Sequence, residues 1–506
     1  MSNLTMLDLF CGGGGSTTGA MQVPGVQVKV AVNHWALAVE THNQNYPSVD
    51  HLLTDVSQTD PRYVPHTDLL WASPECTNHS RAKGTRNWCQ PDMFGETLPV
   101  EAAVRSRATM WDVVRFTETH QYRAVIVENV CEVADWGEAG TMRGGLYKAW
   151  LIAMSNLGYR HKVLSLNSMH AQACGLPAPQ SRDRCYVIFW RDGVPVPDLE
   201  QIIRPQAWCP CCGQIVEAVQ WWKNPGRDID RPGRYRQQYV YHCPNQSCHG
   251  QQVEPGWLPA ASIIDWTDLG VRIGDRRKPL APKTMQRIQA GIDRYWKPSP
   301  APAETQPLLV PVEGRPGKQA DPAGLPLRTQ TCRNETGLAM PPLIGELHGG
   351  HSTCRPASQP LATITAGGNH HALVVPYYGR ANPVTTEDAL PTVTTHDRCA
   401  LIMRNQTCPG DPGYLSTPAD QPIHTLTAAG NQSLLNATSG GVDINDVWFR
   451  MLQPDEIKKA MAFPETYRLL GTRREQVRLA GNAVTPPAAR DIITAVYQAI
   501  TEEAVS

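Results

Sequence analysis

Short apolar runs alternate with helix-like stretches over the first 200 residues, and this alternation restricts the fold more than any other feature. Helical patterns lie between the runs, as in Trp35–Asn45 and Arg107–Thr119. Such alternation is typical of an α/β protein with a doubly wound, mostly parallel sheet. The expected strands are Thr5–Phe10, Val28–Val32, Asp68–Trp71, Ala124–Val127, Lys162–Leu166 and Cys185–Trp190.

The length and the net charge of the chain restrict the number of domains and the kinds of nucleic-acid binder that it could be. A chain of 506 residues is too long for one ordinary domain. With 46 Lys and Arg against 47 Asp and Glu, it is not a globally basic, histone-like nucleic-acid binder. Residues 223–297 nevertheless hold 13 Lys and Arg against 7 Asp and Glu. We therefore expect nucleic-acid affinity to come from this local region, with a moderate salt dependence.

The sequence also predicts where the protein resides. The N-terminus has no charged segment followed by a long apolar stretch, so we expect no signal peptide. The chain contains no run of about 18 apolar residues, so we expect no membrane span. Fifteen cysteines in such a chain are expected to be reduced thiols, with metal or catalytic roles for a few. We therefore expect a cytoplasmic location and no membrane contact.

The middle of the chain changes in composition. Five prolines within residues 298–311 predict a stiff, extended linker. A Thr-x-Thr pattern preceded by proline then recurs, and apolar runs such as Ala372–Pro376 and Ala400–Met403 follow it. We expect a repeated strand–turn–strand unit, either a structural array or a surface that contacts DNA. The four copies are Pro326–Thr331, Pro360–Thr365, Pro391–Thr394 and Pro422–Thr427.

Two cysteine pairs precede this linker. Cys209-x2-Cys212 and Cys243-x4-Cys248 have the spacing of a four-thiolate zinc ribbon, although a buried cysteine cluster is the alternative. A basic and aromatic segment, 231–241, lies between the pairs. In a strand, Arg234 and Arg236 share one face, and the tyrosines of the segment share the other. This face suits contact with a nucleic-acid backbone or groove, or it is a solvated face with a packed back.

Four local motifs carry chemistry. The glycine-rich turn Asp8–Gly15 follows the first strand, and such a turn lets a ligand approach a helix N-terminus, although glycine turns also occur without ligands. Cys76 follows the strand Asp68–Trp71 and is either a nucleophile or a structural thiol. Glu128 ends another strand and shares the same rim, unless it is a plain surface carboxylate. Alternation sends Arg182 and Arg184 to one face, which suits an anion or an electron-rich base.

In this order the motifs resemble those of the DNA cytosine-5 methyltransferases. The resemblance covers about residues 3–195 and 446–500, and its last motif is Gly481-Asn482-Ala483-Val484. It implies the Rossmann-like fold of S-adenosylmethionine-dependent methyltransferases. It also implies a catalytic domain over 1–200, a zinc-ribbon-like insertion over 201–297 and a linker with repeats over 298–445. Together the two middle segments would form a target recognition region, and 446–506 would complete the catalytic domain. The helical patterns of Gln453–Met461 and Pro487–Thr501 fit that last segment.

The resemblance also assigns roles. Cys76 is implied as the thiolate that adds to cytosine C6, while Glu128 binds N3 and the exocyclic amine. Arg182 and Arg184 are implied to hold a base that has left the duplex stack. For the donor S-adenosylmethionine, Asp55 is implied to accept the adenine amine. The remaining cofactor residues are implied to be Phe10, Gly12, Gly14, Gly15, Asn33, Asn482 and Val484.

Some positions depart from the family pattern. Asn33 stands where an acidic residue usually binds the ribose. An amide is uncharged, so its hydrogen bond to the ribose hydroxyls is weaker than that of a carboxylate. Glu75 precedes Cys76 where proline is usual. These departures leave open a modified sulfonium donor. They leave the enzyme class, a DNA (cytosine-5-)-methyltransferase, unchanged.

Other readings remain. The same chemistry could act on tRNA, or the chain could be an inactive DNA-binding relative, although the intact motif residues argue against the latter. We expect a monomer that acts on double-stranded DNA, as a bacterial or phage enzyme of restriction–modification type. The sequence identifies neither the DNA site nor a restriction or host partner.

Overall fold

The structure is a computed structural model that describes most, but not all, of the chain. Within the residues that it describes, no helix is both long and apolar enough to cross a membrane. The described residues are 3–75, 100–137, 143–258, 260–263, 265, 267–268, 270–291, 307–312, 318–330, 335–340, 343–346, 353–356, 371–374, 402–403, 416–417 and 444–502.

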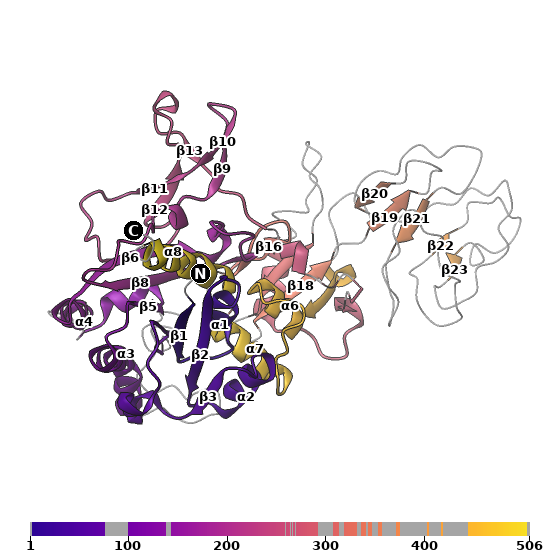
Figure 1. The fold of residues 1–506 in the computed structure, drawn as a ribbon. Helices are drawn as coiled ribbons and strands as arrows, with labels where there is room; N and C mark the ends of the chain where they lie inside the picture. The colour runs from indigo at the N-terminus through magenta and orange to yellow at the C-terminus, as the bar shows by residue number, and fades with distance from the viewer. Residues whose placement is uncertain are drawn as a thin grey trace, which may run out of the picture. The chain divides into compact units, whose positions relative to one another are not determined.

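A seven-stranded sheet forms the centre of the N-terminal part (Figure 1). Its spatial order is β3-β2-β1-β4-β5-β8-β6, and only β8 runs antiparallel to its neighbours. The mostly parallel, doubly wound sheet is confirmed. Its strands are β1 (Leu4–Leu9), β2 (Val26–Asn33), β3 (Asp50–Leu53), β4 (Leu69–Ala72), β5 (Ala124–Asn129), β6 (Tyr159–Asn167) and β8 (Asp183–Arg191).

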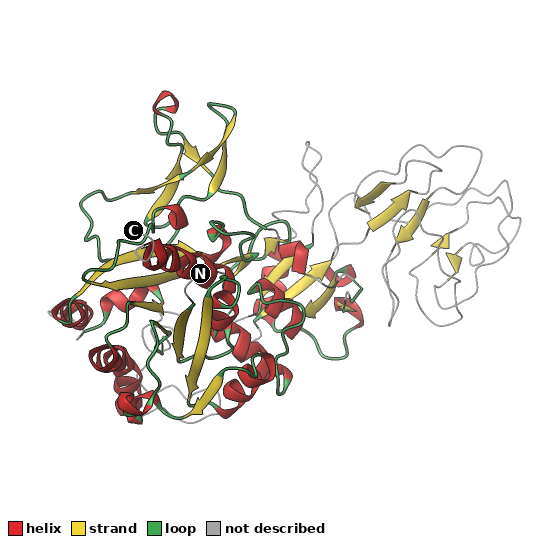
Figure 2. Ribbon diagram, viewed as in Figure 1, coloured by secondary structure: helices red, strands yellow, loops and turns green. Residues whose placement is uncertain are grey.

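Helices cover both faces of this sheet (Figure 2). Alternate strand residues enter two separate cores, because successive side chains point to opposite faces. Met6 joins a core with the C-terminal helix residue Ile492, whereas Leu7 joins one with Phe116 and Trp150. The helices are α1 (Gly15–Ala20), α2 (Ala36–Asn45), α3 (Val100–His120), α4 (Gly145–Asn156), α6 (Pro454–Ala460), α7 (Arg473–Asn482) and α8 (Pro486–Glu502).

The C-terminal helices belong to the same unit as this sheet. The unit comprises residues 1–263, 326–334 and 453–506. Helix α8 packs against α1 closely enough that a Cβ on Gly19 would lie 2.5 Å from the carbonyl oxygen of Pro486. Residues nearly 470 positions apart thus share one core.

The same unit also contains short strands outside the large sheet. They form a hairpin, a three-stranded sheet and one isolated parallel pair. These strands are β9 (Gln206–Cys209), β10 (Gln214–Glu217), β11 (Val219–Trp222), β12 (Tyr239–His242), β13 (Gln252–Val253), β7 (Gln180–Ser181) and β17 (Leu327–Arg328).

A second unit comprises residues 264–325 and 335–452. Its main sheet has the order β14-β24-β18-β15-β16. The helix α5 (Pro282–Gly291) packs on β15. The strands are β14 (Val271–Arg272), β15 (Leu308–Pro311), β16 (Asp321–Pro322), β18 (Thr336–Met340), β19 (Leu343–Glu346), β20 (Thr353–Pro356), β21 (His371–Val374), β22 (Ile402–Met403), β23 (Ser416–Thr417) and β24 (Trp448–Met451).

The expectation of an extended linker over 298–311 can be compared with the structure only at its end, because residues 298–306 lie outside the described part of the chain. The end of the segment expected as an extended linker is β15, which pairs with β18 on one side and β16 on the other. Leu308 and Val310 are fully buried there, so apolar burial outweighs the proline content. The apolar runs after two repeats do form strands, β21 and β22. The repeat cores at 360–365, 391–394 and 422–427 lie outside the described residues.

Candidate active site

Three parallel strands end at one edge of the large sheet, and the antiparallel β8 begins there. Leu9, Ala72 and Val127 lie side by side in neighbouring strands. Asn129, at the end of β5, pairs with Cys185 near the start of β8. Side chains from four separate segments therefore meet at the edge where open α/β sheets bind their ligands.

Asn129 holds the segment that leads to Cys76. Its Nδ2 donates a hydrogen bond to the carbonyl oxygen of Pro74 at 3.4 Å, and its Oδ1 accepts one from the backbone N–H of Val130 at 2.8 Å. Cys76 lies outside the described residues, and the neighbouring Glu75 is half-buried. The sequence pattern predicts no role for Asn129, although it lies in the same motif as Glu128.

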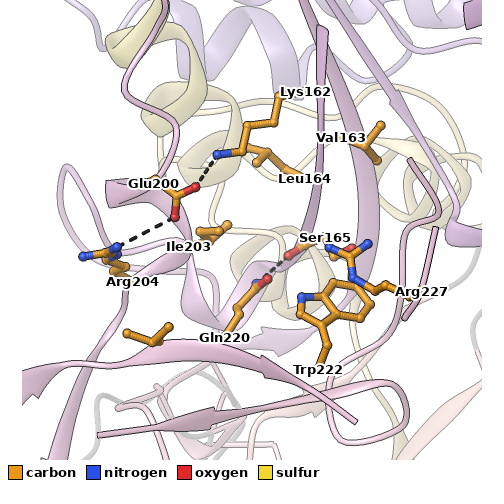
Figure 3. A pocket seen from close by; sticks show the side chains of 11 residues that line it. Lys162, Val163, Leu164, Ser165, Glu200, Ile203, Arg204, Gln220, Trp222 and Arg227 are labelled. Atoms are coloured by element: carbon orange, nitrogen blue, oxygen red, sulfur yellow. Dashed lines mark hydrogen bonds and ion pairs between the residues drawn. The ribbon is translucent and has the colours of Figure 1, made fainter. Parts of the chain in front are cut away.

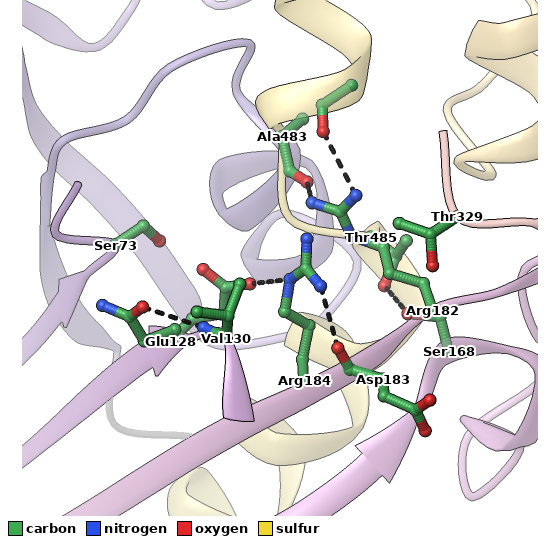
Figure 4. A network of polar contacts seen from close by, with 12 residues as sticks. Ser73, Glu128, Val130, Ser168, Arg182, Asp183, Arg184, Thr329, Ala483 and Thr485 are labelled. Atoms are coloured by element: carbon green, nitrogen blue, oxygen red, sulfur yellow. Dashed lines mark hydrogen bonds and ion pairs between the residues drawn. The ribbon is translucent and has the colours of Figure 1, made fainter. Parts of the chain in front are cut away.

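Glu128 and Arg184 form an ion pair at this edge (Figure 4). Arg184 Nε lies 2.9 Å from Glu128 Oε1, and the two side chains are 12% and 9% exposed. Arg184 Nη1 also donates to the carbonyl oxygen of Asp183 at 2.8 Å. The pair is shielded from water, so its orientation is well defined.

Arg182 contacts different partners from Arg184. Its guanidinium donates to the carbonyl oxygens of Gly481 at 3.1 Å and Ala483 at 3.0 Å (Figure 4). It therefore joins the start of β8 to the end of α7, and it is only 3% exposed. Both arginines lie at the start of β8, but Arg182 binds the C-terminal segment, whereas Arg184 binds Glu128.

The first Thr-x-Thr repeat also lies at this edge. Strand β17 pairs in parallel with β7, and Thr329 Oγ1 donates to the carbonyl oxygen of Ser181 at 2.7 Å. The carbonyl oxygen of Gln330 accepts a hydrogen bond from Arg182 Nη1 at 3.3 Å. The repeat predicted a strand here, but not its partner, because the two segments are 150 residues apart.

The glycines of the turn after β1 have two different functions. A Cβ on Gly15 would overlap the carbonyl oxygen of Val484, and one on Gly14 would overlap the hydroxyl of Tyr467. At Gly12 the nearest such atom, Phe10 O, is 3.7 Å away. Gly14 and Gly15 are therefore needed for packing within the chain, whereas Gly12 leaves room for a ligand. Phe10, in the same turn, has a φ of 59°, which is a strained conformation for a non-glycine residue.

The residues expected to bind the rest of the cofactor differ in availability. Asn33 Oδ1 accepts a hydrogen bond from the backbone N–H of Trp35 at 2.9 Å, so this oxygen is already engaged. Asp55 Oδ1 accepts from Ser57 N at 3.0 Å, and its side chain is half-buried.

The two expected cofactor residues near the C-terminus differ in their exposure to solvent. Asn482 is exposed at the end of α7, whereas Val484 is buried. A further aromatic residue, Trp35, was not predicted as a site residue. The Arg478 guanidinium lies 4.4 Å from the centre of its ring.

Asp8 is a buried carboxyl group directly before the glycine turn. Its Oδ2 accepts hydrogen bonds from Ser16 Oγ at 2.6 Å and Thr17 Oγ1 at 2.7 Å. His42 Nε2 lies 2.9 Å from Thr17 Oγ1, and His42 Nδ1 lies 2.8 Å from His51 Nε2. Burial raises the pKa of Asp8 to about 6 and lowers the pKa of His42 to about 3.

The Asp8 pKa predicts a specific pH dependence of stability. A carboxyl group with a raised folded-state pKa costs no stability below its ordinary value of 3.8, and its full cost appears above about 6. The difference in unfolding free energy between wild type and Asp8→Asn should therefore shift against wild type by about 3 kcal/mol as the pH rises through this window. Urea unfolding of both proteins at pH 4 to 7 measures it. A difference that stays constant with pH would contradict the buried, ionising carboxyl group.

The four predicted zinc-ribbon cysteines lie together. The Sγ atoms of Cys209, Cys212, Cys243 and Cys248 are all within 4.8 Å of one another. The Sγ atoms of Cys209 and Cys248 are 3.8 Å apart. Tetrahedral zinc with four thiolates at about 2.3 Å requires sulfur–sulfur distances of about 3.8 Å. The donor set and its size fit zinc.

The arginines between these cysteine pairs are paired within the chain. Arg234 forms an ion pair with Glu132, and Arg236 pairs with Glu254. Tyr239 and Tyr241 are fully buried. The tyrosines therefore form a packed core, the two arginines are paired with carboxylates of the chain, and contact of these arginines with a nucleic acid stays a prediction.

A cavity of about 220 Å³ lies between β6, β11 and the residues after β8 (Figure 3). Arg227 stacks on Trp222, with its guanidinium carbon 3.5 Å from the ring centre. Lys162 pairs with Glu200 at the other side of the cavity. None of the predicted catalytic or cofactor residues lines it, so the cavity is separate from the sheet edge.

Comparison with known proteins identifies the family of the chain. The sequence profile of the C-5 cytosine-specific DNA methylase family matches residues 4–207 and 394–498, more than half of the chain. Type II methyltransferase M.HgiDI of Herpetosiphon aurantiacus is 30% identical over 202 residues, which are 39% of this chain and 55% of that protein. Type II methyltransferase M.AgeI of Thalassovita gelatinovora is 23% identical over 522 aligned positions, covering 98% of this chain and 99% of that protein. Among solved structures, the methyltransferase EhMeth of Entamoeba histolytica has a TM-score of 0.44 and 9% identity, covering 98% of this chain and 99% of that one.

Proposed function

Because the chain belongs to the C-5 cytosine-specific DNA methylase family, we propose that it transfers a methyl group from S-adenosylmethionine to C5 of cytosine in double-stranded DNA. The observation that supports this most directly is the shielded Glu128–Arg184 pair. It lies at the sheet edge where the chain runs towards Cys76. A carboxylate, a guanidinium and a thiol are the groups that this chemistry needs.

The reaction assigns work to each of these groups. Cytosine C5 is a poor nucleophile until the Cys76 thiolate adds to C6, which makes C5 enamine-like. Glu128 would bind N3 and the exocyclic amine and offset the charge that develops there. Arg184 would hold the Glu128 carboxylate in place. After methyl transfer a base removes the C5 proton, the C6–S bond breaks, and Cys76 is free again.

The cofactor would bind beside the glycine turn. S-adenosylmethionine supplies a methyl group carried on a sulfonium. Phe10 would contact the adenine, and Asp55 would accept its amine. The open position at Gly12 supports close approach of the methionine portion. The engaged Oδ1 of Asn33 argues for a weaker ribose contact, and it is one reason to test a modified donor.

One assay separates this proposal from its alternatives. The protein is incubated with methyl-labelled S-adenosylmethionine and either duplex DNA or tRNA, and the modified nucleoside is identified after digestion. Labelled 5-methylcytosine in DNA supports the proposal. Label found only in tRNA would move the activity to RNA. DNA binding without any label would indicate an inactive relative or a different donor, which a modified sulfonium in the same assay distinguishes.

We also propose that the four cysteines bind one structural zinc ion. The four sulfur atoms already lie close to the spacing of a tetrahedral site, and one pair is at 3.8 Å. Metal analysis of folded, unchelated protein should find about one zinc per chain, and chelation should destabilise the insertion. Substantially less than one zinc in such a sample would count against the site.

A further inference from the structure

We propose that the zinc-bound insertion positions the catalytic edge, with the Tyr235 backbone and Asp183 as the link. Asp183 lies between Arg182 and Arg184 in the sequence. The inference rests on the zinc site and the activity proposed above. It adds a positioning role for a segment that otherwise serves as a candidate DNA-binding module.

The metal site and the tyrosines form one core. Cys209, Cys243 and Cys248 are buried in the same apolar cluster as Tyr239 and Tyr241. Met169, from the segment after β6, belongs to this cluster too. The geometry at the sulfur atoms is therefore packed directly against the tyrosine layer.

The tyrosine layer contacts the catalytic part through His170. The ring of His170 stands edge-on to Tyr235, with centroids 4.6 Å apart at 87°, and to Tyr241, with centroids 5.2 Å apart at 88°. His170 is fully buried. A displacement of the tyrosines would leave a void beside this ring, and voids in a packed interior are costly.

One hydrogen bond carries the link to β8. The backbone N–H of Tyr235 donates to Asp183 Oδ1 at 3.0 Å, and Asn167 Nδ2 donates to the same oxygen at 3.0 Å. The carbonyl oxygen of Asp183 accepts from Arg184 Nη1. Arg184 in turn pairs with Glu128. The position of Tyr235 thus helps to determine where the Glu128–Arg184 pair lies.

Neighbouring contacts reinforce the link. The backbone N–H of Gly233 donates to Ser165 Oγ at 2.9 Å. Arg234 pairs with Glu132, four residues after Glu128. Tyr147 donates its hydroxyl to the carbonyl oxygen of Asp230 at 3.0 Å. These contacts reach the segment after β5, the strand β6 and the helix α4, whereas Phe10 and Asp55, proposed for the cofactor, follow β1 and β3.

The insertion needs the metal to keep this position. Its strands β9 to β13 have only two to four residues each. Segments of this size bury too little apolar surface to hold a fixed conformation, so metal binding supplies much of their folding free energy. Loss of zinc should therefore release Tyr235 and loosen Asp183, while the large sheet stays folded.

The test compares two cysteine variants of the full chain. Cys212→Ser removes a metal ligand, whereas Cys211→Ser makes the same change at the exposed neighbouring thiol. For Cys212→Ser we expect zinc loss, faster amide hydrogen exchange in residues 180–186 and 233–241, and a kcat lowered by about tenfold or more. The Kd for S-adenosylmethionine should change less than kcat, because Phe10 and Asp55 follow β1 and β3, away from the insertion, and only Arg182 links the loosened segment to the carbonyl oxygens on either side of Asn482. Cys211→Ser should match wild type in every measurement.

A third variant keeps the inference testable if Cys212→Ser fails to fold. Asp183→Ala removes the acceptor but leaves the cysteines, so it should retain zinc and still lower kcat by about tenfold. Zinc loss with unchanged exchange in 180–186 would overturn the inference, as would Asp183→Ala with wild-type kcat. If wild type transfers no methyl group, the proposed activity has failed, but the exchange comparison still decides whether the metal site and β8 are coupled.

Discussion

Replacing Cys76 with serine is expected to lower methyl transfer by about four orders of magnitude or more, because a serine hydroxyl is almost never ionised at neutral pH. The loss should appear in kcat, with the Kd for S-adenosylmethionine unchanged. The measurement is single-turnover transfer of labelled methyl groups to duplex DNA. The matched control is Cys174→Ser, the same change at an exposed thiol of the same unit, which should retain full activity.

The covalent step can be tested separately. In a duplex that carries 5-fluorocytosine, the fluorine cannot leave as a proton does, so elimination is blocked and the enzyme should stay bonded to the DNA. A denaturation-resistant complex is expected with wild type and Cys174→Ser, and none with Cys76→Ser. Methyl transfer or complex formation that survives in Cys76→Ser would refute the role of this thiol.

Replacing Glu128 with alanine should damage both stability and catalysis. Arg184 would then be left as a buried charge without its carboxylate partner, and breaking such a pair costs about 3–5 kcal/mol of unfolding free energy. Loss of the group that stabilises developing charge on the base should lower kcat by about 10²- to 10³-fold. Urea unfolding and the methyl-transfer assay measure the two effects.

A double variant separates these two effects. Glu128→Gln combined with Arg184→Met replaces both charges with neutral groups of similar size, so most of the lost stability should return. Activity should stay low, because the carboxylate and the guanidinium are both absent. Recovery of activity along with stability would mean that the pair has only a structural role.

Local patterns predicted most of the large sheet. The six expected strands are confirmed as β1, β2, β4, β5, β6 and β8, because each is an apolar run bounded by turn residues. The strand β3 was not predicted, and α1 was expected only as the helix that follows the glycine turn. Helix α1 has six residues rich in glycine and threonine, which carry little helical signal, and it forms because it packs on α8.

Tertiary contacts changed the interpretation of particular residues. Gly14 and Gly15 lie in a turn whose sequence is typical of a ligand-binding site. A side chain at either position would nevertheless collide with the C-terminal segment, so glycine is needed there for packing. Arg234 and Arg236 have the signature of a nucleic-acid contact, yet each has a carboxylate partner within the chain. A one-dimensional pattern does not distinguish these cases, since both the ligand and the distant segment favour the same residue types.

The sequence by itself determined the class of fold, the order of the motifs and the four cysteines that meet in space. These features depend on local periodicity and on residue chemistry, which are readable without distances. Only the tertiary structure decided that Arg182 binds the C-terminal segment, that Glu128 is paired with Arg184, and that the Tyr235 backbone reaches Asp183. Such contacts join segments from about 50 to 300 residues apart, and their formation depends on how whole elements pack, which no local pattern records.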